Sequence, residues 1–166
     1  PVASDGVPGR QDGRLDRFLD QGRYKLILRG APQAQDTATI AVRPFVELQP
    51  KPQRLSLLEP IVSELGDCQQ RSYWLEVKER GPVFLEAGGR WLNALHLWRD
   101  GLTLLDLPVE RRALQPQPGR PLTALTLDTV LDPGFYRVTL YGGREQTPWT
   151  QHSEDKPLYL RLGVPR

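Results

Sequence analysis

Few residues in this 166-residue chain have the type and spacing that acid–base or nucleophilic chemistry needs. His152 is followed directly by Ser153 in a polar segment, and a histidine beside a serine is one ingredient of a hydrolase. Adjacent residues rarely converge into the geometry of a catalytic triad, however. The other histidine, His96, stands between Leu95 and Leu97, where we expect a structural residue of a strand. The sequence therefore predicts no catalytic residue.

Metal and cofactor binding have equally little support. Cys68 is the single cysteine, which excludes an internal disulfide and a cysteine-based metal site. Asp16 and Asp20, like Asp128 and Asp132, are four residues apart and could in principle bind calcium, but they lack the dense oxygen-ligand spacing of such sites. Turn and capping roles explain these aspartates better. Neither GxxxxGK[ST] nor GxGxxG is present, so we predict no metal and no cofactor.

Two tryptophans are the candidate residues for binding a ligand or partner. Trp74 alternates with Tyr73 and Leu75, which places it on the opposite face of its expected strand. Trp149 stands in a polar loop. Exposed tryptophans commonly anchor sugars or protein partners. The alternative for both is burial under a second layer of the structure.

An internal repeat indicates which elements position these side chains. Residues 15–30 (LDRFLDQGRYKLILRG) align without a gap with residues 127–142 (LDTVLDPGFYRVTLYG). The shared positions are those that a β-hairpin or the start of a strand needs. The identical pairs are Leu15/Leu127, Asp16/Asp128, Leu19/Leu131, Asp20/Asp132, Gly22/Gly134, Tyr24/Tyr136, Leu28/Leu140 and Gly30/Gly142.

Each copy predicts a turn followed by a strand with one apolar face. Asp-Gln-Gly and Asp-Pro-Gly suit turns in which Gly22 or Gly134 takes a positive φ. The expected inward side chains are Tyr24, Leu26 and Leu28, then Ala38, Ile40 and Val42, in the first copy, and Tyr136, Val138 and Leu140, then Leu158, Leu160 and Leu162, in the second. Both copies are therefore predicted to be strand, loop, strand units.

The middle of the chain reads as further short strands separated by turns. We expect strands around residues 73–77, 83–87, 91–98 and 102–107, a short helix at 60–65, and a short helical turn with a loop at 108–121. The predicted fold is all-β: a β-sandwich or jelly roll of about eight to ten short antiparallel strands with at most short helices.

The predicted organisation has three parts. Residues 1–13 are a flexible lead-in, residues 14–50 are the first repeat unit packing on the rest, and residues 55–166 are the main sandwich. The Pro-rich segment 49–54 is the best candidate boundary. The first part contains too few strands to stand alone, so we expect it to pack on the sandwich or on something outside this sequence.

Composition excludes some function classes. The 22 basic and 20 acidic residues are interleaved, which argues against nucleic-acid binding. No stretch approaches the length of a membrane-spanning helix. The sequence contains no methionine, so we expect a processed protein or a part of a longer one.

The end of the chain carries a family resemblance. The run LDPGFYRVTLYGG, a loop with Pro-Trp, and PLYLRLG together resemble the amino-terminal β-domains of bacterial alpha-2-macroglobulin-like proteins. They are also similar to the secreted pre-peptidase C-terminal sandwich, whose last strands often read L-x-x-G-x-Y. The resemblance covers residues 73–163 and, through the repeat, residues 15–48. Cys68-Gln69-Gln70 does not match the macroglobulin thioester motif, in which Glu-Gln follows the cysteine at a distance.

The resemblance implies a non-catalytic binding or scaffold module of a large, protease-trapping protein in the periplasm or cell envelope. Its partners would be proteins: other domains of the same chain, envelope proteins or proteases. The alternative is a secreted accessory module that binds carbohydrate or protein.

Overall fold

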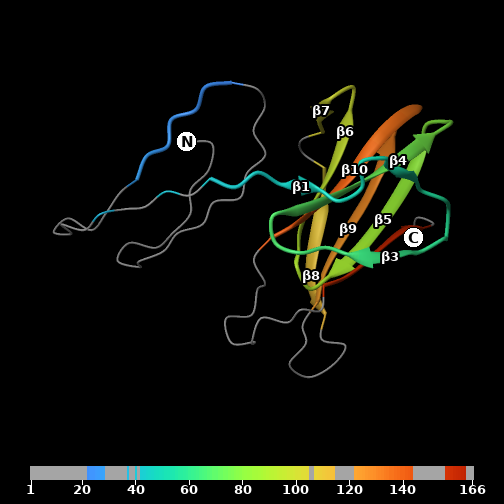
Figure 1. Ribbon diagram of the computed structural model, residues 1–166. Helices are drawn as coiled ribbons and strands as arrows, with labels where there is room; N and C mark the ends of the chain where they lie inside the picture. Colours follow the sequence, from blue (N-terminus) through green and yellow to red (C-terminus); the bar gives the residue numbers. More distant parts are fainter. Residues whose placement is uncertain are drawn as a thin grey trace. The chain divides into compact units, whose positions relative to one another are not determined.

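The computed structural model describes residues 22–28, 37, 40, 42–104, 107–114, 122–143 and 156–163. The chain divides into two compact units, Pro1–Val42 and Arg43–Arg166, and each is described by itself. The described residues contain eleven strands and no helix, and all eleven strands belong to the second unit (Figure 1). They form two sheets in a sandwich-like arrangement, which confirms the predicted all-β fold class.

The first sheet has six strands in the order β1-β4-β10-β6-β7, with β2 paired to β4 beside β1. Its strands β4, β10 and β6 are antiparallel, whereas the short β1 and β2 run parallel to β4. Their bounds are β1 Val46–Glu47, β2 Gln53–Arg54, β4 Gln69–Val77, β6 Leu92–Arg99, β7 Leu102–Thr103 and β10 Gly134–Gly142.

The second sheet has five antiparallel strands in the order β3-β11-β5-β9-β8. Its central strand β5 is paired on both sides, with β11 and β9. The bounds are β3 Ile61–Glu64, β5 Gly81–Gly89, β8 Val109–Leu114, β9 Leu122–Leu131 and β11 Pro157–Gly163.

The core lies between the sheets and is built from the alternating side chains that the sequence pattern predicts. Val138 of β10 is fully buried and lies opposite Tyr73 of β4 and Leu97 of β6. Leu158 and Leu160 of β11 are buried in the same cluster. Each such side chain contributes about 1.5–3 kcal/mol of burial energy. The predicted inward parity of β4, β10 and β11 is thus confirmed.

The turn of the second repeat copy is a corner between the two sheets. Strand β9 belongs to the second sheet and β10 to the first, so Asp132 and Pro133 carry the chain across the sandwich and do not close a hairpin. Gly134 has a φ of 153°, which confirms the predicted positive φ. The Tyr136 hydroxyl donates a hydrogen bond to the Asp132 carbonyl oxygen at 2.8 Å. Arg99 donates to the same hydroxyl at 3.3 Å and to the Pro133 carbonyl at 3.3 Å. This is a tyrosine corner of the kind found in other sandwiches.

Removing the corner hydroxyl should destabilise the sandwich. In Tyr136→Phe the buried ring remains but the hydrogen bond to Asp132 is lost, so we expect the free energy of unfolding to fall by about 1 kcal/mol. Urea denaturation with an unchanged m-value measures this difference. Tyr159→Phe is the control, because Tyr159 lies half-buried on β11 outside the corner. A Tyr136→Phe protein as stable as the control would contradict the role of the corner.

Two predicted helical segments are strands in the structure. The predicted helix at 60–65 is wrong: Ile61–Glu64 form β3, which pairs with β11. The predicted helical turn within 108–121 is also wrong over Val109–Leu114, which form β8 and pair with β9. Pairing at the edges of an existing sheet decides both cases, because strand formation depends on neighbouring strands more than on local propensity.

The first repeat copy differs from the second. Residues 22–28 carry no strand, and the side chains of Tyr24, Leu26 and Leu28 are half or more exposed. Ile40 and Val42 also lie outside any strand, and Ala38 lies outside the described residues. The prediction of equivalent strands is therefore wrong for this copy, because an apolar alternation forms a strand only beside a hydrogen-bonded neighbour. Packing of the first copy on the sandwich stays a prediction.

Candidate partner-binding face

Trp74 lies on the outer face of the first sheet. It is the exposed member of β4, whose flanking side chains Tyr73 and Leu75 point into the core. The Trp74 side chain is 41% exposed, so no second layer covers it among the described residues. The alternation that buries β4 on one side presents this indole on the other.

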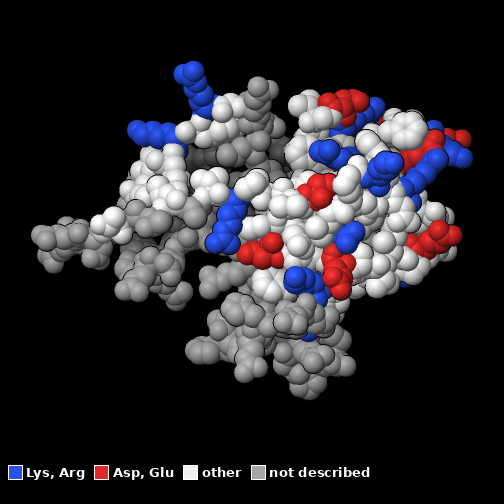
Figure 2. All heavy atoms as spheres, in the orientation of Figure 1, with Lys and Arg blue, Asp and Glu red and all other residues white. Residues whose placement is uncertain are grey.

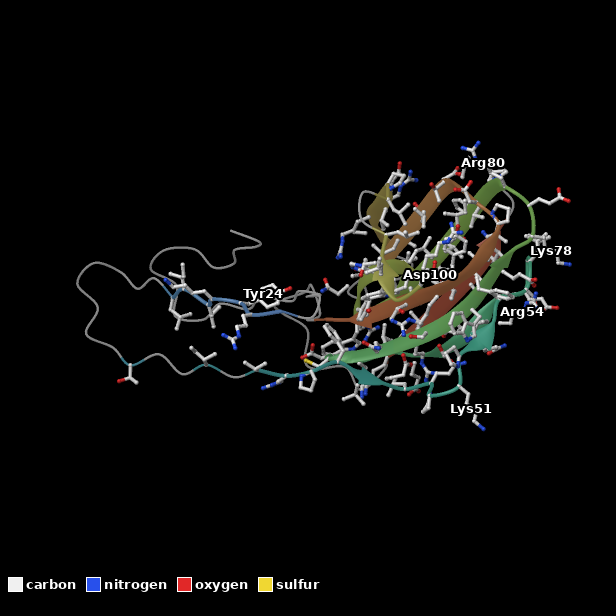
Figure 3. All side chains as sticks on the ribbon, turned by 90° about the horizontal axis from the view of Figure 1, so that it is seen from above. Tyr24, Lys51, Arg54, Lys78, Arg80 and Asp100 are labelled. Carbon is white, nitrogen blue, oxygen red and sulfur yellow. The ribbon has the colours of Figure 1, made fainter. Side chains whose placement is uncertain are left out.

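A shallow hollow of about 310 Å³ lies beside the Trp74 ring. Its lining consists of Pro52, Arg54, Trp74 and Phe135. Arg54 of β2 is paired with Trp74, and Phe135 of β10 is paired with Glu76, the next outward residue of β4. Arg54 forms an ion pair with Glu76, and Figure 3 shows its side chain at the same end of the sandwich as Lys78. The hollow is therefore an apolar surface with one cationic edge.

A row of large side chains extends from this hollow across the sheet. Arg137 of β10 lies opposite Trp74 on one side and Trp98 of β6 on the other. The Arg137 guanidinium carbon is 5.0 Å from the centroid of the Trp98 ring. This cation–π contact contributes about 0.5–1 kcal/mol and holds the row in place.

A cluster of polar side chains around Ser72 of β4 holds the edge strand β1 in place through hydrogen bonds. Glu47 accepts hydrogen bonds from the Ser72 hydroxyl at 2.6 Å, from the Ser72 amide at 3.3 Å and from the Gln70 side chain at 3.3 Å. The Gln49 amide donates to the same carboxylate at 2.9 Å, and the Ser72 and Thr139 hydroxyls are 3.2 Å apart. The carboxylate is thus saturated by donors from β4 and from the chain just after β1, which suits a structural role.

His96 is a neutral aromatic member of the same face. Its ring meets Tyr141 edge-on at 5.5 Å and lies 6.5 Å from Trp98. Burial lowers the pKa of His96 below its usual value. Burial also raises the pKa of Tyr141 to about 12. At neutral pH both side chains are therefore uncharged and serve packing on the outer face.

A second hollow, of about 320 Å³, opens between the edges of the two sheets. Arg111 of β8 donates across it to the Asn93 carbonyl of β6. Burial lowers the pKa of Arg111, which remains a cation at neutral pH. The rest of the lining is mostly side chains of the core and its margin: Leu95, Leu97, Leu104, Leu107, Val109 and Leu125. This hollow is a gap in the packing at the sheet edges, with fewer exposed aromatic groups than the first.

The sequence candidates are only partly placed by the structure. Trp74 is on the exposed face, whereas Trp149, His152 and Ser153 lie outside the described residues. Cys68 is half-buried in the turn before β4, with a φ of 54°. Within the described ranges, no group of three His, Cys, Asp or Glu side chains could hold a metal ion. No helix in the described part of the chain is long and apolar enough to cross a membrane.

Sequence reasoning missed the partners of Trp74 in the hollow. Phe135 is 62% exposed and precedes the buried Tyr136, so the parity argument applied to Trp74 would have found it. Arg54 and Pro52 lie in the segment predicted to be a connection, and only the pairing of β2 with β4 brings them to the hollow. Figure 2 shows basic and acidic side chains interspersed on the visible face of the sandwich, in keeping with the sequence.

The fold places the chain among β-sandwich proteins. No protein-family model matches the sequence, and no curated protein matches it significantly. Among solved structures, it is similar to the pre-peptidase C-terminal domain of collagenase from Bacillus anthracis. The two are 13% identical with a TM-score of 0.44, and the match covers 74% of this chain and 99% of that chain. None of these comparisons supports the macroglobulin resemblance.

Proposed function

We propose that the sandwich is a non-catalytic binding module that holds a protein partner on the outer face of its first sheet. The observation that carries the proposal is the pair of exposed rings, Trp74 and Phe135, that share one hollow with Arg54. Tryptophan and arginine dominate the energetic centres of protein interfaces, where an apolar anchor fills a pocket rimmed by polar groups. The hollow fits an apolar side chain of a partner.

The lining of the hollow favours a protein over a sugar. A sugar site needs several polar groups placed to fix the hydroxyls of its ligand beside an aromatic ring. Here the lining offers Pro52, two aromatic rings and one guanidinium, and that guanidinium is already paired with Glu76. An apolar contact with limited hydrogen bonding is the better match.

The wider context of the module rests on the sequence resemblance. We propose a large protein of the alpha-2-macroglobulin type in the periplasm or cell envelope, in which this module contributes contacts and no reaction. An accessory module that binds carbohydrate is the alternative, and the experiment below separates the two kinds of ligand.

Truncating Trp74 should abolish most of the binding. Peptides selected from a phage-displayed random library on the immobilised chain serve as probes, and calorimetric titration gives their dissociation constants. We expect Trp74→Ala to weaken binding of the selected peptides at least tenfold, which is about 1.4 kcal/mol. The stability of the variant should change little, because the indole is largely outside the core.

Val62→Ala is the matched control, because Val62 is an exposed apolar residue on β3 of the other sheet. Peptide affinity should be the same for this variant and the unmodified chain. If no peptide is enriched, or if Trp74→Ala binds the peptides equally well, the proposed face is wrong. Titration with oligosaccharides forms a second arm, and binding there that depends on Trp74 would favour the carbohydrate module instead.

A further inference from the structure

We propose that residues 22–28 are the central strand of a second sandwich of the same kind, whose flanking strands lie outside residues 1–166. The proposal concerns the first unit only and does not depend on the binding face. It rests on two observations: the ungapped repeat, and the different surroundings of the two copies in the structure.

The repeat assigns a specific place in the fold to the first copy. Residues 22–28 correspond to Gly134–Leu140, the first seven residues of β10. The correspondence includes the turn glycine and the tyrosine of the corner, since Gly22 and Tyr24 stand where Gly134 and Tyr136 do. The Tyr24 side chain lies back over Gly22, with atoms 3.5–3.7 Å from the position of a Cβ there, whereas the nearest atoms to the same position at Gly134 belong to Arg99. A corner of this type occurs where a chain crosses between two packed sheets.

The second copy shows what such a strand requires on both sides. β10 is hydrogen-bonded to β4 and to β6 along most of its length. Its inward residue Val138 is fully buried between Tyr73 and Leu97. A side chain at this place in the fold therefore needs one large apolar neighbour from each flanking strand.

The first copy has apolar side chains at the equivalent positions, but no neighbouring strand among the described residues buries them. Leu26, which corresponds to Val138, is 57% exposed, and Leu28 and Ile27 are exposed to a similar extent. Contiguous exposed apolar side chains of this kind are typical of surfaces that a partner covers. Lys25 keeps the positive charge of Arg137 on the opposite face, whereas Arg23 and Ile27 stand there in place of Phe135 and Thr139.

The sandwich described above has no vacancy for this strand at the equivalent place. Both sides of β10 are already paired, and β10 itself fills the centre of the first sheet. Strands equivalent to β4 and β6 that flank residues 22–28 are therefore additional to the strands that the structure describes. A second sandwich is therefore the partner expected to cover residues 22–28, and addition of the segment to an edge strand of the first sandwich is the competing outcome.

Hydrogen exchange distinguishes these outcomes. In the 166-residue chain we expect the amides of residues 23–28 to exchange without protection, while those of β10 are strongly protected. In the longer product of the natural gene, the same amides should gain protection of at least a hundredfold. Leu26→Asp should abolish that gain and leave the protection of β10 unchanged.

Three results would overturn the proposal. Protection of residues 23–28 in the 166-residue chain would show that they already pack on the described sandwich or on a second copy. A natural gene product without further strands would contain nothing that could form the second sandwich around residues 22–28. Exchange in the longer product that stays as fast as in the 166-residue chain would show that no strand forms. None of these results bears on Trp74, so the proposed function stands or falls separately.

Discussion

A single methyl group added at Gly142 is expected to disrupt the sandwich. Gly142 ends β10, next to an irregularity in the pairing of β10 with β6. A Cβ at this position would clash with the carbonyl oxygen of Gly66 and approach the Gly66 carbonyl carbon to 2.9 Å. Both are backbone atoms, which cannot swing away as the end of a side chain can. The buried Leu65 stands at 3.2 Å on the same side.

The expected cost follows from this lack of freedom. Overpacking of a core costs about 1–3 kcal/mol when side chains can adjust, and more when they cannot. We therefore expect Gly142→Ala to lose at least about 3 kcal/mol, a large part of the 5–15 kcal/mol that stabilises a typical domain. Thermal denaturation followed by circular dichroism should show a fall in Tm of roughly 10 °C or more.

Gly81→Ala is the matched control. Gly81 also lies at the end of a central strand, but its nearest neighbour for an added Cβ is the Glu79 carbonyl oxygen at 3.8 Å, an ordinary contact. Its stability should stay within about 0.5 kcal/mol of the unmodified chain. Equal Tm values for the two variants would show that the backbones of Gly142 and Gly66 leave enough space for a methyl group.

Alternating side chains made much of the fold predictable. The inward residues of β4, β10 and β11 follow from a period of two, and the turn glycine at 134 follows from Asp-Pro-Gly. The pattern does not predict which strands lie beside one another in a sheet. Ile61–Glu64 form a strand because β11 lies beside them, whereas the alternating pattern of β10 recurs at residues 22–28 without forming a strand.

The candidate site was predictable only at its centre. Parity alone places Trp74 on the outer face, because Tyr73 and Leu75 take the core. The rest of the hollow depends on which strands lie beside β4. Arg54 reaches it through a parallel pairing of only two residues, and Phe135 through the order of β4 and β10 in the sheet. Non-local pairing of this kind leaves no signal in a single sequence.

The same substitution at equivalent positions of the two repeat copies should destabilise the chain strongly in the second copy and hardly at all in the first. Val138→Asp places a carboxylate in the core between Tyr73 and Leu97, where no partner compensates its lost hydration. Such a change costs several kcal/mol, either as an unpaired charge or as a carboxyl group forced to stay protonated. We expect the 166-residue chain to lose its cooperative unfolding transition and its near-ultraviolet circular dichroism signal.

Leu26→Asp is the same change at the corresponding position of the first copy. Because the Leu26 side chain is exposed, the carboxylate keeps its hydration, and the unfolding transition should move by less than about 0.5 kcal/mol. The milder pair Val138→Ala and Leu26→Ala keeps the comparison measurable, with about 2 kcal/mol lost in the first variant and almost none in the second. If Leu26→Asp destabilised the chain as strongly as Val138→Asp, residue 26 would already be part of the described core. The repeat would then mark two strands of one sandwich, and the second sandwich would not be needed to cover the first copy.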